Sequence, residues 1–185
     1  MASSGAVIIT GVPGVGKSTV LEAAQRHAGY PVVVYGTKMF EVAVAKGLVK
    51  DRDEMRRLPP ATQREIQIAA AEAIAAMGRV VVDTHCTIKT PQGYLPGLPA
   101  WVVQKLAPTQ VILVEAPPED ILKRRANDPS RKRDPDTVEE IAAHQAMNRM
   151  AAMTVATLTG ATVQVIVNRE GKVDETREQI VRTLA

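Results

Sequence analysis

Nine consecutive residues near the start of the chain combine the side chains and the backbone freedom that nucleotide phosphates require. They follow the spacing Gly-x-x-x-x-Gly-Lys-Ser, and their glycines let the main chain close around anionic oxygens, because glycine tolerates positive φ and has no side chain. The backbone N–H groups, the positive end of a following helix and the Lys17 ammonium together favour a triphosphate. The nine residues are Gly11, Val12, Pro13, Gly14, Val15, Gly16, Lys17, Ser18 and Thr19.

A hydroxyl and a carboxylate are placed to hold the Mg²⁺ that accompanies a triphosphate. The Ser18 hydroxyl belongs to the loop, and Asp83 follows an apolar run that we predict to be a buried strand. An alternative role for Asp83 is that of a hydrogen-bond partner of the glycine loop. His85 either orients water or a phosphate or is structural, and the sequence leaves both roles open.

A run of basic residues offers the cations that phosphoryl transfer needs. Guanidinium groups match the equatorial oxygens of a transferring phosphoryl group, so we predict an arginine clamp that closes over bound phosphates. The competing interpretation, a nucleic-acid patch, is disfavoured because the aromatic content is 3% and the net charge only +3. The basic residues are Arg124, Arg125, Arg131, Lys132 and Arg133.

Two further segments offer contacts for a second anionic substrate. Thr37 follows the second predicted strand, where open α/β sheets bind ligands, and Arg57 lies at the turn into a long predicted helix, within reach of a substrate phosphate. The alternative for the charged segment around Arg57 is a solvated face. Residues 87–99 are so rich in Pro and Gly that we expect a loop without regular structure. Its Lys89 and Gln92 offer charge and hydrogen bonds, the alternative being a packed surface loop.

The elements that must position these residues alternate along the chain. Apolar, β-branched runs predict strands at residues 6–9, 32–35, 79–85, 110–115 and 162–167. Helical patterns with glycine or proline at their ends predict helices at residues 18–28, 36–46, 59–77, 99–106, 118–126, 136–158 and 173–184. Asp136 and Glu139 have the spacing of a capping box at the start of the penultimate helix. The order predicts an α/β fold of the P-loop NTPase type, a five-stranded parallel sheet with helices on both faces.

Composition limits the remaining possibilities. With 185 residues, of which 45% are hydrophobic, the chain is expected to form one domain with a single substantial core. Cys86 is the only cysteine, which excludes an internal disulfide and is typical of a reducing compartment. The first residues carry no basic segment, and the apolar run after them ends at the glycine loop, so we expect neither a signal peptide nor a membrane span. We therefore expect a cytoplasmic protein.

Several long motifs together resemble those of the archaeal-type adenylate kinases. Besides the glycine loop, they include Gly36-Thr37 with Met39-Phe40-Glu41, Asp83-Thr84-His85, and Ile88-Lys89-Thr90-Pro91 followed by Gly93-Tyr94-Leu95-Pro96-Gly97-Leu98-Pro99. They continue through residues 131–134, His144-Gln145, Met147-Asn148-Arg149 and residues 158–162. The resemblance spans nearly the whole chain. The chain lacks the Asp-Gly-Phe-Pro-Arg signature of bacterial and eukaryotic adenylate kinases, so AMP contacts known in those enzymes do not transfer directly.

The resemblance implies an enzyme and assigns roles to the residues above. It implies reversible phosphoryl transfer from MgATP to AMP giving two ADP, with Mg²⁺ held by Ser18 and Asp83, a short lid at residues 125–136 and an AMP-side segment at residues 36–78. It also implies a homotrimer. The implied catalytic groups are Lys17, Arg125, Arg131 and Arg133, and residues 11–19 bind ATP. Thr37 and Arg57 are the implied AMP contacts, to which Lys89 and Gln92 are added from their expected place in the pocket.

Two other functions fit the same glycine loop. One is an ATP-driven switch or assembly protein acting on ribosomal partners, because related proteins share a glycine loop and an Asp-x-His segment. The other is a kinase for a different nucleoside monophosphate. Dependence of ADP formation on AMP, compared with CMP, UMP and GMP, separates the three.

Overall fold

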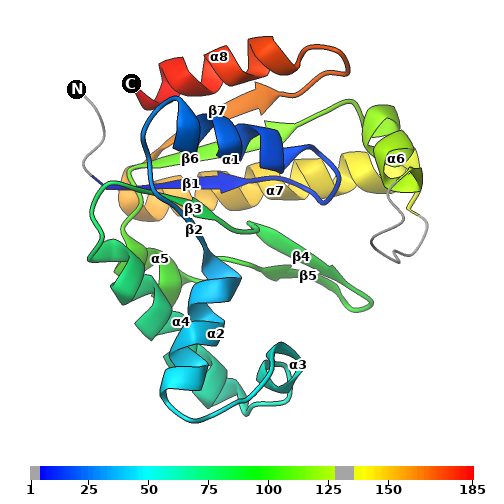
Figure 1. The fold of residues 1–185 in the computed structure, drawn as a ribbon. Coiled ribbons are helices and arrows are strands. Elements are labelled where there is room, and N and C mark those ends of the chain that lie inside the picture. Colours follow the sequence, from blue (N-terminus) through cyan, green and yellow to red (C-terminus); the bar gives the residue numbers. More distant parts are fainter. Residues whose placement is uncertain (1–4, 128–135) are drawn as a thin grey trace.

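A parallel sheet forms the centre of the molecule (Figure 1). The computed structural model describes residues 5–127 and 136–185. Five strands form the sheet in the order β2-β3-β1-β6-β7, and every pair of neighbours is parallel. This confirms the predicted fold class. The strands are β1 (Ala6–Thr10), β2 (Val32–Val34), β3 (Val80–Asp83), β6 (Gln110–Glu115) and β7 (Thr162–Val167).

Helices cover both faces of this sheet, as predicted. Side chains alternate between the faces of a strand, so Ile8 packs with residues of α4, α5 and α7, whereas Val7 and Ile9 pack with residues of α1 and α8. The helices are α1 (Lys17–Arg26), α2 (Tyr35–Ala45), α3 (Arg52–Met55), α4 (Pro60–Ala75), α5 (Ala100–Leu106), α6 (Pro118–Ala126), α7 (Val138–Thr159) and α8 (Val173–Leu184). None of them, in the parts of the chain that the structure describes, is long and apolar enough to cross a bilayer.

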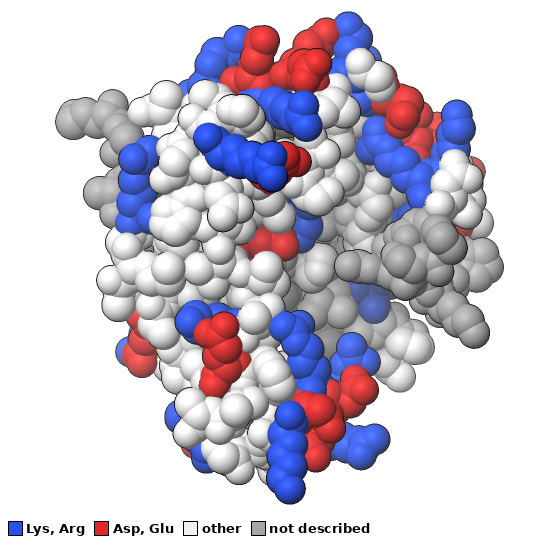
Figure 2. All heavy atoms as spheres, viewed as in Figure 1, with Lys and Arg blue, Asp and Glu red and all other residues white. Residues whose placement is uncertain are grey.

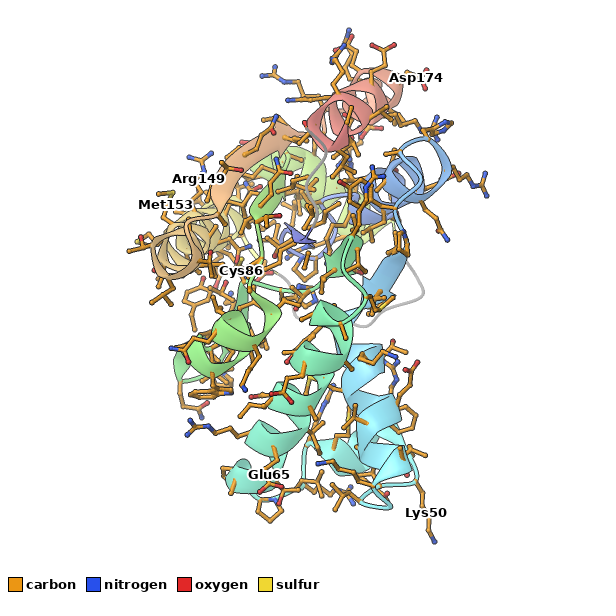
Figure 3. All side chains as sticks on the ribbon, turned by 90° about the vertical axis from the view of Figure 1, so that its left-hand side faces the viewer. Lys50, Glu65, Cys86, Arg149, Met153 and Asp174 are labelled. Atoms are coloured by element: carbon orange, nitrogen blue, oxygen red, sulfur yellow. The ribbon has the colours of Figure 1, made fainter. Side chains whose placement is uncertain are left out.

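The segment that contains α2, α3 and α4 extends away from the sheet and has a small core of its own. Ala43, Val49 and Ile66 are buried there, with Phe40 and Met55 packed against them. Figure 3 shows α2 and α4 side by side, with Lys50 and Glu65 near the far end of this segment. Tyr35 of α2 and Ala70, Ala71 and Ile74 of α4 belong to the main core, so the separate cluster supports only the far end of this segment.

Residues 87–99 are not the irregular loop that their composition predicts. Strands β4 (Thr87–Thr90) and β5 (Gly93–Pro96) pair in an antiparallel hairpin. The prolines do not prevent this, because Pro91 lies in the turn and Pro96 ends the outer strand of a two-stranded sheet, where a missing N–H is tolerated. Gly93 supplies the positive φ of 125° that follows the turn.

The capping box of α7 lies one residue later than predicted. Thr137 Oγ1 accepts a hydrogen bond from the Glu140 N–H at 3.2 Å, and Glu140 Oε2 accepts one from the Thr137 N–H at 2.9 Å. Asp136 does not cap the helix, because its carboxylate is occupied by Lys89 and Arg125. The prediction of Asp136 and Glu139 was therefore wrong, although the start of the helix was close.

Cys86 lies between the sheet and α5 (Figure 3). It is 1% exposed, and its N–H donates to Thr10 Oγ1 at 2.9 Å. Burial raises the pKa of its thiol to about 11.

Candidate active site

The glycine loop joins β1 to α1, as the motif predicts. Gly14 and Gly16 have φ values of 87° and 89°, in the left-handed region that favours glycine. Gly11 is needed for a different reason: a Cβ there would lie 2.5 Å from the Val114 carbonyl oxygen of β6. Two glycines therefore serve backbone conformation, and the third serves the close approach of loop and sheet.

Lys17 and Asp83 meet at the edge of the sheet where the parallel strands end. Asp83 is the last residue of β3 and pairs in register with Ile9 of β1, which leads into the loop. The Lys17 ammonium donates to the Asp83 carboxylate and, at 3.1 Å, to the Thr84 carbonyl oxygen. Both side chains are mostly buried, at 15% and 18% exposure. A lysine held in this way is ordered beside the loop before any phosphate binds.

The oxygen groups predicted for Mg²⁺ come from α1 and from the end of β3. Ser18 is exposed in the first turn of α1, and the Asp83 carboxylate keeps some access to solvent. Among residues 5–127 and 136–185, no group of three or more His, Cys, Asp or Glu side chains could hold a metal by itself.

Arg125 links the loop to the start of α7. Its Nε donates to the Pro13 carbonyl oxygen at 2.7 Å, and its guanidinium pairs with Asp136. Asp136 also accepts from Lys89 Nζ at 2.8 Å, and Lys89 lies 3.1 Å from Glu140. Partial burial alone would raise the pKa of Asp136, but its hydrogen bonds to Lys89 and Arg125 hold it below the ordinary value.

The remaining lid arginines, Arg131 and Arg133, lie outside the described residues, as does most of the lid predicted at residues 125–136. Arg125 and Asp136 are its two described ends.

The predicted contacts for the second substrate are spread over two regions. Thr37 is in the first turn of α2, and its hydroxyl accepts a hydrogen bond from Arg52 Nη2 at 2.6 Å. Arg57 is exposed after α3, and its N–H donates to the Glu54 carbonyl oxygen at 3.0 Å. Arg52, which the sequence reasoning missed, is thus the arginine that contacts Thr37.

The two hairpin residues predicted to contact the second substrate, Lys89 and Gln92, lie in different surroundings. Lys89 shares one face with Thr87 and Tyr94, which contact α7 through Asn148 and His144. Gln92 is exposed in the turn at the tip. Lys89 thus contacts acidic groups at the start of α7, and the hydrogen bonds that it donates to Asp136 and Glu140 raise its pKa.

Two histidines lie near these groups. Loss of hydration lowers the pKa of His85, and the Lys17 ammonium lowers it further, which favours the neutral imidazole. His144 is 7% exposed, and its Nε2 lies 3.1 Å from the Thr87 hydroxyl, which donates to Asn148 at 2.6 Å. Because that hydroxyl already donates to Asn148, it accepts from the Nε2–H of His144.

Figure 2 shows the surface hollowed between the upper part of this face, where the glycine loop lies, and the α3 end at the bottom, with charged side chains at both rims. The hollow faces the carboxyl ends of the strands. This is the place where open parallel sheets bind ligands.

Comparison with solved structures identifies the class of fold. A shikimate kinase from Acinetobacter baumannii, in complex with shikimate, superposes with a TM-score of 0.58 at 14% identity, over 97% of this chain and 92% of that one. A shikimate kinase from Bacteroides thetaiotaomicron gives a TM-score of 0.55 at 12% identity, over 97% and 98%. A family model described as an AAA domain matches residues 10–142. The chain therefore has the fold of the P-loop kinases.

Sequence relatives narrow the class further. The adenylate kinase of Methanopyrus kandleri is 51% identical over 184 residues, or 96% of each chain, and that of Thermoplasma acidophilum is 49% identical over 96% of this chain and 97% of its own. That of Methanocaldococcus jannaschii is 49% identical over 96% and 97%. The chain belongs to the adenylate kinase family. The family and the phosphotransferase function predicted from the sequence are thereby confirmed.

Proposed function

We propose that the chain catalyses reversible transfer of the γ-phosphoryl group of MgATP to AMP, giving two ADP. The main observation in support is the Lys17 ammonium held against Asp83 and the Thr84 carbonyl at the mouth of a glycine loop, in a chain about half identical to adenylate kinases. Phosphoryl transfer needs positioning and neutralisation of charge more than covalent catalysis. The site supplies both without a nucleophilic side chain.

On the donor side, residues 11–19 bind the ATP phosphates through backbone N–H groups and Lys17. When ATP enters, Lys17 exchanges the Asp83 carboxylate for phosphate oxygens, a change of partner that keeps its charge neutralised. Arg125, anchored on the Pro13 carbonyl, stands beside the same loop. Arg131 and Arg133 would complete the cationic lid over the transferring group.

Mg²⁺ fits the proposed site because the site offers a small number of oxygen ligands, which this hard cation prefers. Mg²⁺ keeps several waters and binds through one or two protein oxygens together with substrate phosphates. Ser18 and Asp83 supply such a pair, Asp83 once Lys17 has moved to the phosphates. Held there by Ser18 and Asp83, Mg²⁺ would neutralise the negative charge that develops during phosphoryl transfer.

On the acceptor side, Thr37 and Arg57 bind AMP, with Lys89 and Gln92 at the hairpin. The segment at residues 36–78 supports this role because α2, α3 and α4 share a small core and carry exposed basic groups on the rim of the hollow. Arg52 joins this set, because its guanidinium already orients the Thr37 hydroxyl.

A coupled assay of ADP formation tests the reaction. Purified chain with MgATP and AMP should form ADP, whereas MgATP with CMP, UMP, GMP or no acceptor should form little. Phosphate release at the same rate without AMP would contradict the proposal and favour an ATP-driven switch. Faster turnover with another nucleoside monophosphate would retain phosphoryl transfer and reassign the acceptor.

We also propose that the chain self-associates as a trimer through the outer face of α7 and the edge strand β7. Met150, Met153 and Leu158 of α7 are 57%, 56% and 51% exposed, and Val167 of β7 is 40% exposed. Figure 3 shows Arg149 and Met153 directed outward from this face. Large exposed apolar side chains that lie together favour burial by a partner.

Sedimentation velocity tests the trimer. Met153→Glu should shift the chain to monomers, while Val44→Glu, at an apolar position on α2 that is 46% exposed, should leave the assembly unchanged. A parent chain that sediments as a monomer would contradict the trimer without affecting the proposed reaction. The cytoplasmic location stays a prediction from the sequence.

A further inference from the structure

Asn168, the residue after β7, is fixed at the back of the glycine loop. It is 4% exposed, and its N–H donates to the Glu115 carbonyl oxygen at 2.7 Å, which extends the pairing of β7 with β6 by one residue. Its position is therefore set by the central sheet and not by the loop that it touches.

The side-chain amide of Asn168 is directed at the loop backbone. Its Nδ2 donates to the Val15 carbonyl oxygen at 3.0 Å, and its Oδ1 lies 3.4 Å from the Thr176 hydroxyl of α8. A carbonyl oxygen can only accept a hydrogen bond, so the NH₂ end must face Val15. The orientation of the amide is thus fixed by its surroundings.

Arg124 gives the same carbonyl a second donor. Its Nη1 donates to the Val15 carbonyl at 3.1 Å, and its Nη2 donates to the Asn168 carbonyl at 3.2 Å. Glu170 holds the outer side of the guanidinium at 3.1 Å. Both lone pairs of the Val15 carbonyl oxygen can therefore be occupied.

Because the peptide between Val15 and Gly16 is planar, fixing the Val15 carbonyl also fixes the orientation of the Gly16 N–H. No peptide bond in the described residues is cis, and in a trans peptide the C=O and the following N–H point in opposite directions. Holding the Val15 oxygen toward Asn168 turns the Gly16 N–H away from it. Gly16 itself packs on the amide, because a Cβ at this position would lie 2.2 Å from Asn168 Nδ2.

We propose that Asn168 is a positioning residue for the glycine loop: it holds the Val15 carbonyl outward, so that the Gly16 N–H faces the bound phosphates. The inference rests on the proposed binding of ATP by residues 11–19. Without the Asn168 amide, Arg124 Nη1 alone holds the Val15 carbonyl, so the Val15–Gly16 peptide rotates more readily. A rotated peptide presents a carbonyl oxygen to the phosphates in place of a donor. The role is specific to ATP, since AMP is bound by other residues.

Two variants and a control test the role of Asn168. Asn168→Asp keeps the shape but removes the donor, and Asn168→Ala removes the amide altogether. Glu170→Gln, at the exposed partner of Arg124, leaves the Val15 contacts in place. Equilibrium titration calorimetry with MgATP and, separately, with AMP should show about tenfold weaker ATP binding in both Asn168 variants. AMP binding, and both affinities of Glu170→Gln, should stay within about twofold of the parent.

Each outcome separates a positioning role from a structural one. ATP affinity within twofold of the parent in folded Asn168→Asp and Asn168→Ala would overturn the proposal, as would equal losses for ATP and AMP. If only Asn168→Ala fails to fold, the ATP affinity of Asn168→Asp tests the proposal. If both variants fail to fold, Asn168 maintains the fold, and the proposal is overturned. A parent chain that does not bind ATP contradicts the proposed function itself, whereas a normal parent with normal variants contradicts the role of Asn168 alone.

Discussion

The two sides of the hollow hold their binding groups in different ways. On the donor side, Arg124, Arg125 and Asn168 donate hydrogen bonds to backbone carbonyls of the glycine loop. On the acceptor side, the exposed Arg52 of the short helix α3 donates to the Thr37 hydroxyl. The side chains of Arg125 and Asn168 are mostly buried, and Asn168 is also bonded to the central sheet through its N–H. Arg52 and Thr37 belong to a segment whose own core is small. Exposed hydrogen bonds and a small core lower the cost of local opening, so we expect the acceptor side to open more readily.

The largest effect on this comparison should come from Lys17→Ala. Loss of the ammonium removes charge stabilisation on the donor side, and turnover should fall by about a thousandfold. The circular dichroism spectrum should stay unchanged, because the Lys17 side chain, within the described residues, donates its hydrogen bonds to the Asp83 carboxylate and the Thr84 carbonyl. Lys172→Ala, which removes an exposed partner of Glu175, is the matched control and should keep parental turnover. Parental turnover in Lys17→Ala would contradict the donor site.

A pair of glycine variants compares the two sides directly. Gly16 and Gly47 both have positive φ, at 89° and 68°, but a Cβ at Gly16 would meet Asn168 whereas at Gly47 it meets nothing within 4 Å. Gly47→Ala should cost only about 1 kcal/mol of stability from backbone strain. Gly16→Ala should cost more and reduce turnover about a hundredfold, since the loop must shift. Thermal unfolding measures the stability of each variant, and the ADP assay measures its turnover. Equal effects of Gly16→Ala and Gly47→Ala would contradict the difference between the donor and acceptor sides.

A smaller effect is expected for Arg57→Ala. If Arg57 binds the AMP phosphate, the KM for AMP should rise about tenfold while the KM for ATP stays constant, because a charge-assisted hydrogen bond is lost. Arg56→Ala, at the exposed neighbouring position, should change neither value. Arg52→Ala should raise the KM for AMP by a smaller factor through the freed Thr37 hydroxyl. If the KM for AMP rises in Arg52→Ala but not in Arg57→Ala, then Arg52 and not Arg57 contacts AMP.

The smallest effect is a pH dependence of stability carried by His144. Burial lowers the pKa of His144 in the folded chain below its unfolded value of about 6.5. The unfolded state therefore binds more protons in this range, and stability is full above pH 6.5 and declines as the pH falls below it. Urea unfolding at pH 7.5 and 5.5 should show this loss, and it should be smaller in His144→Gln. If His144→Gln loses as much stability between pH 7.5 and 5.5 as the parent, His144 does not cause this pH dependence.

The elements that local sequence defines were the ones that could be predicted. The β-branched runs gave all five strands of the sheet, and the Gly-x-x-x-x-Gly-Lys-Ser spacing located the loop, because both patterns lie within a few consecutive residues. The hairpin of β4 and β5 was missed because proline and glycine were interpreted as breakers, although in a two-stranded sheet they can lie at the turn and the outer edge.

Residues that act over long separations left no local signal. Asn168 contacts Val15 across 153 positions, and Lys89 reaches Asp136 across 47. Arg52 lies in a charged segment in which several exposed arginines look alike, and only the fold selects the one that reaches Thr37. Predicting such contacts needs the packing of α6, α7 and β7 around the loop, which follows from the whole chain.

The burial of Cys86 has a practical consequence. As the only thiol, shielded and with its pKa raised to about 11, it is unreactive toward alkylating reagents while the sheet and α5 stay closed. The rate of its alkylation in native buffer therefore measures how often this part of the core opens, with no introduced label. A nucleotide that binds only the closed chain should slow that rate in proportion to its occupancy, so the native thiol can serve as a ligand-binding reporter.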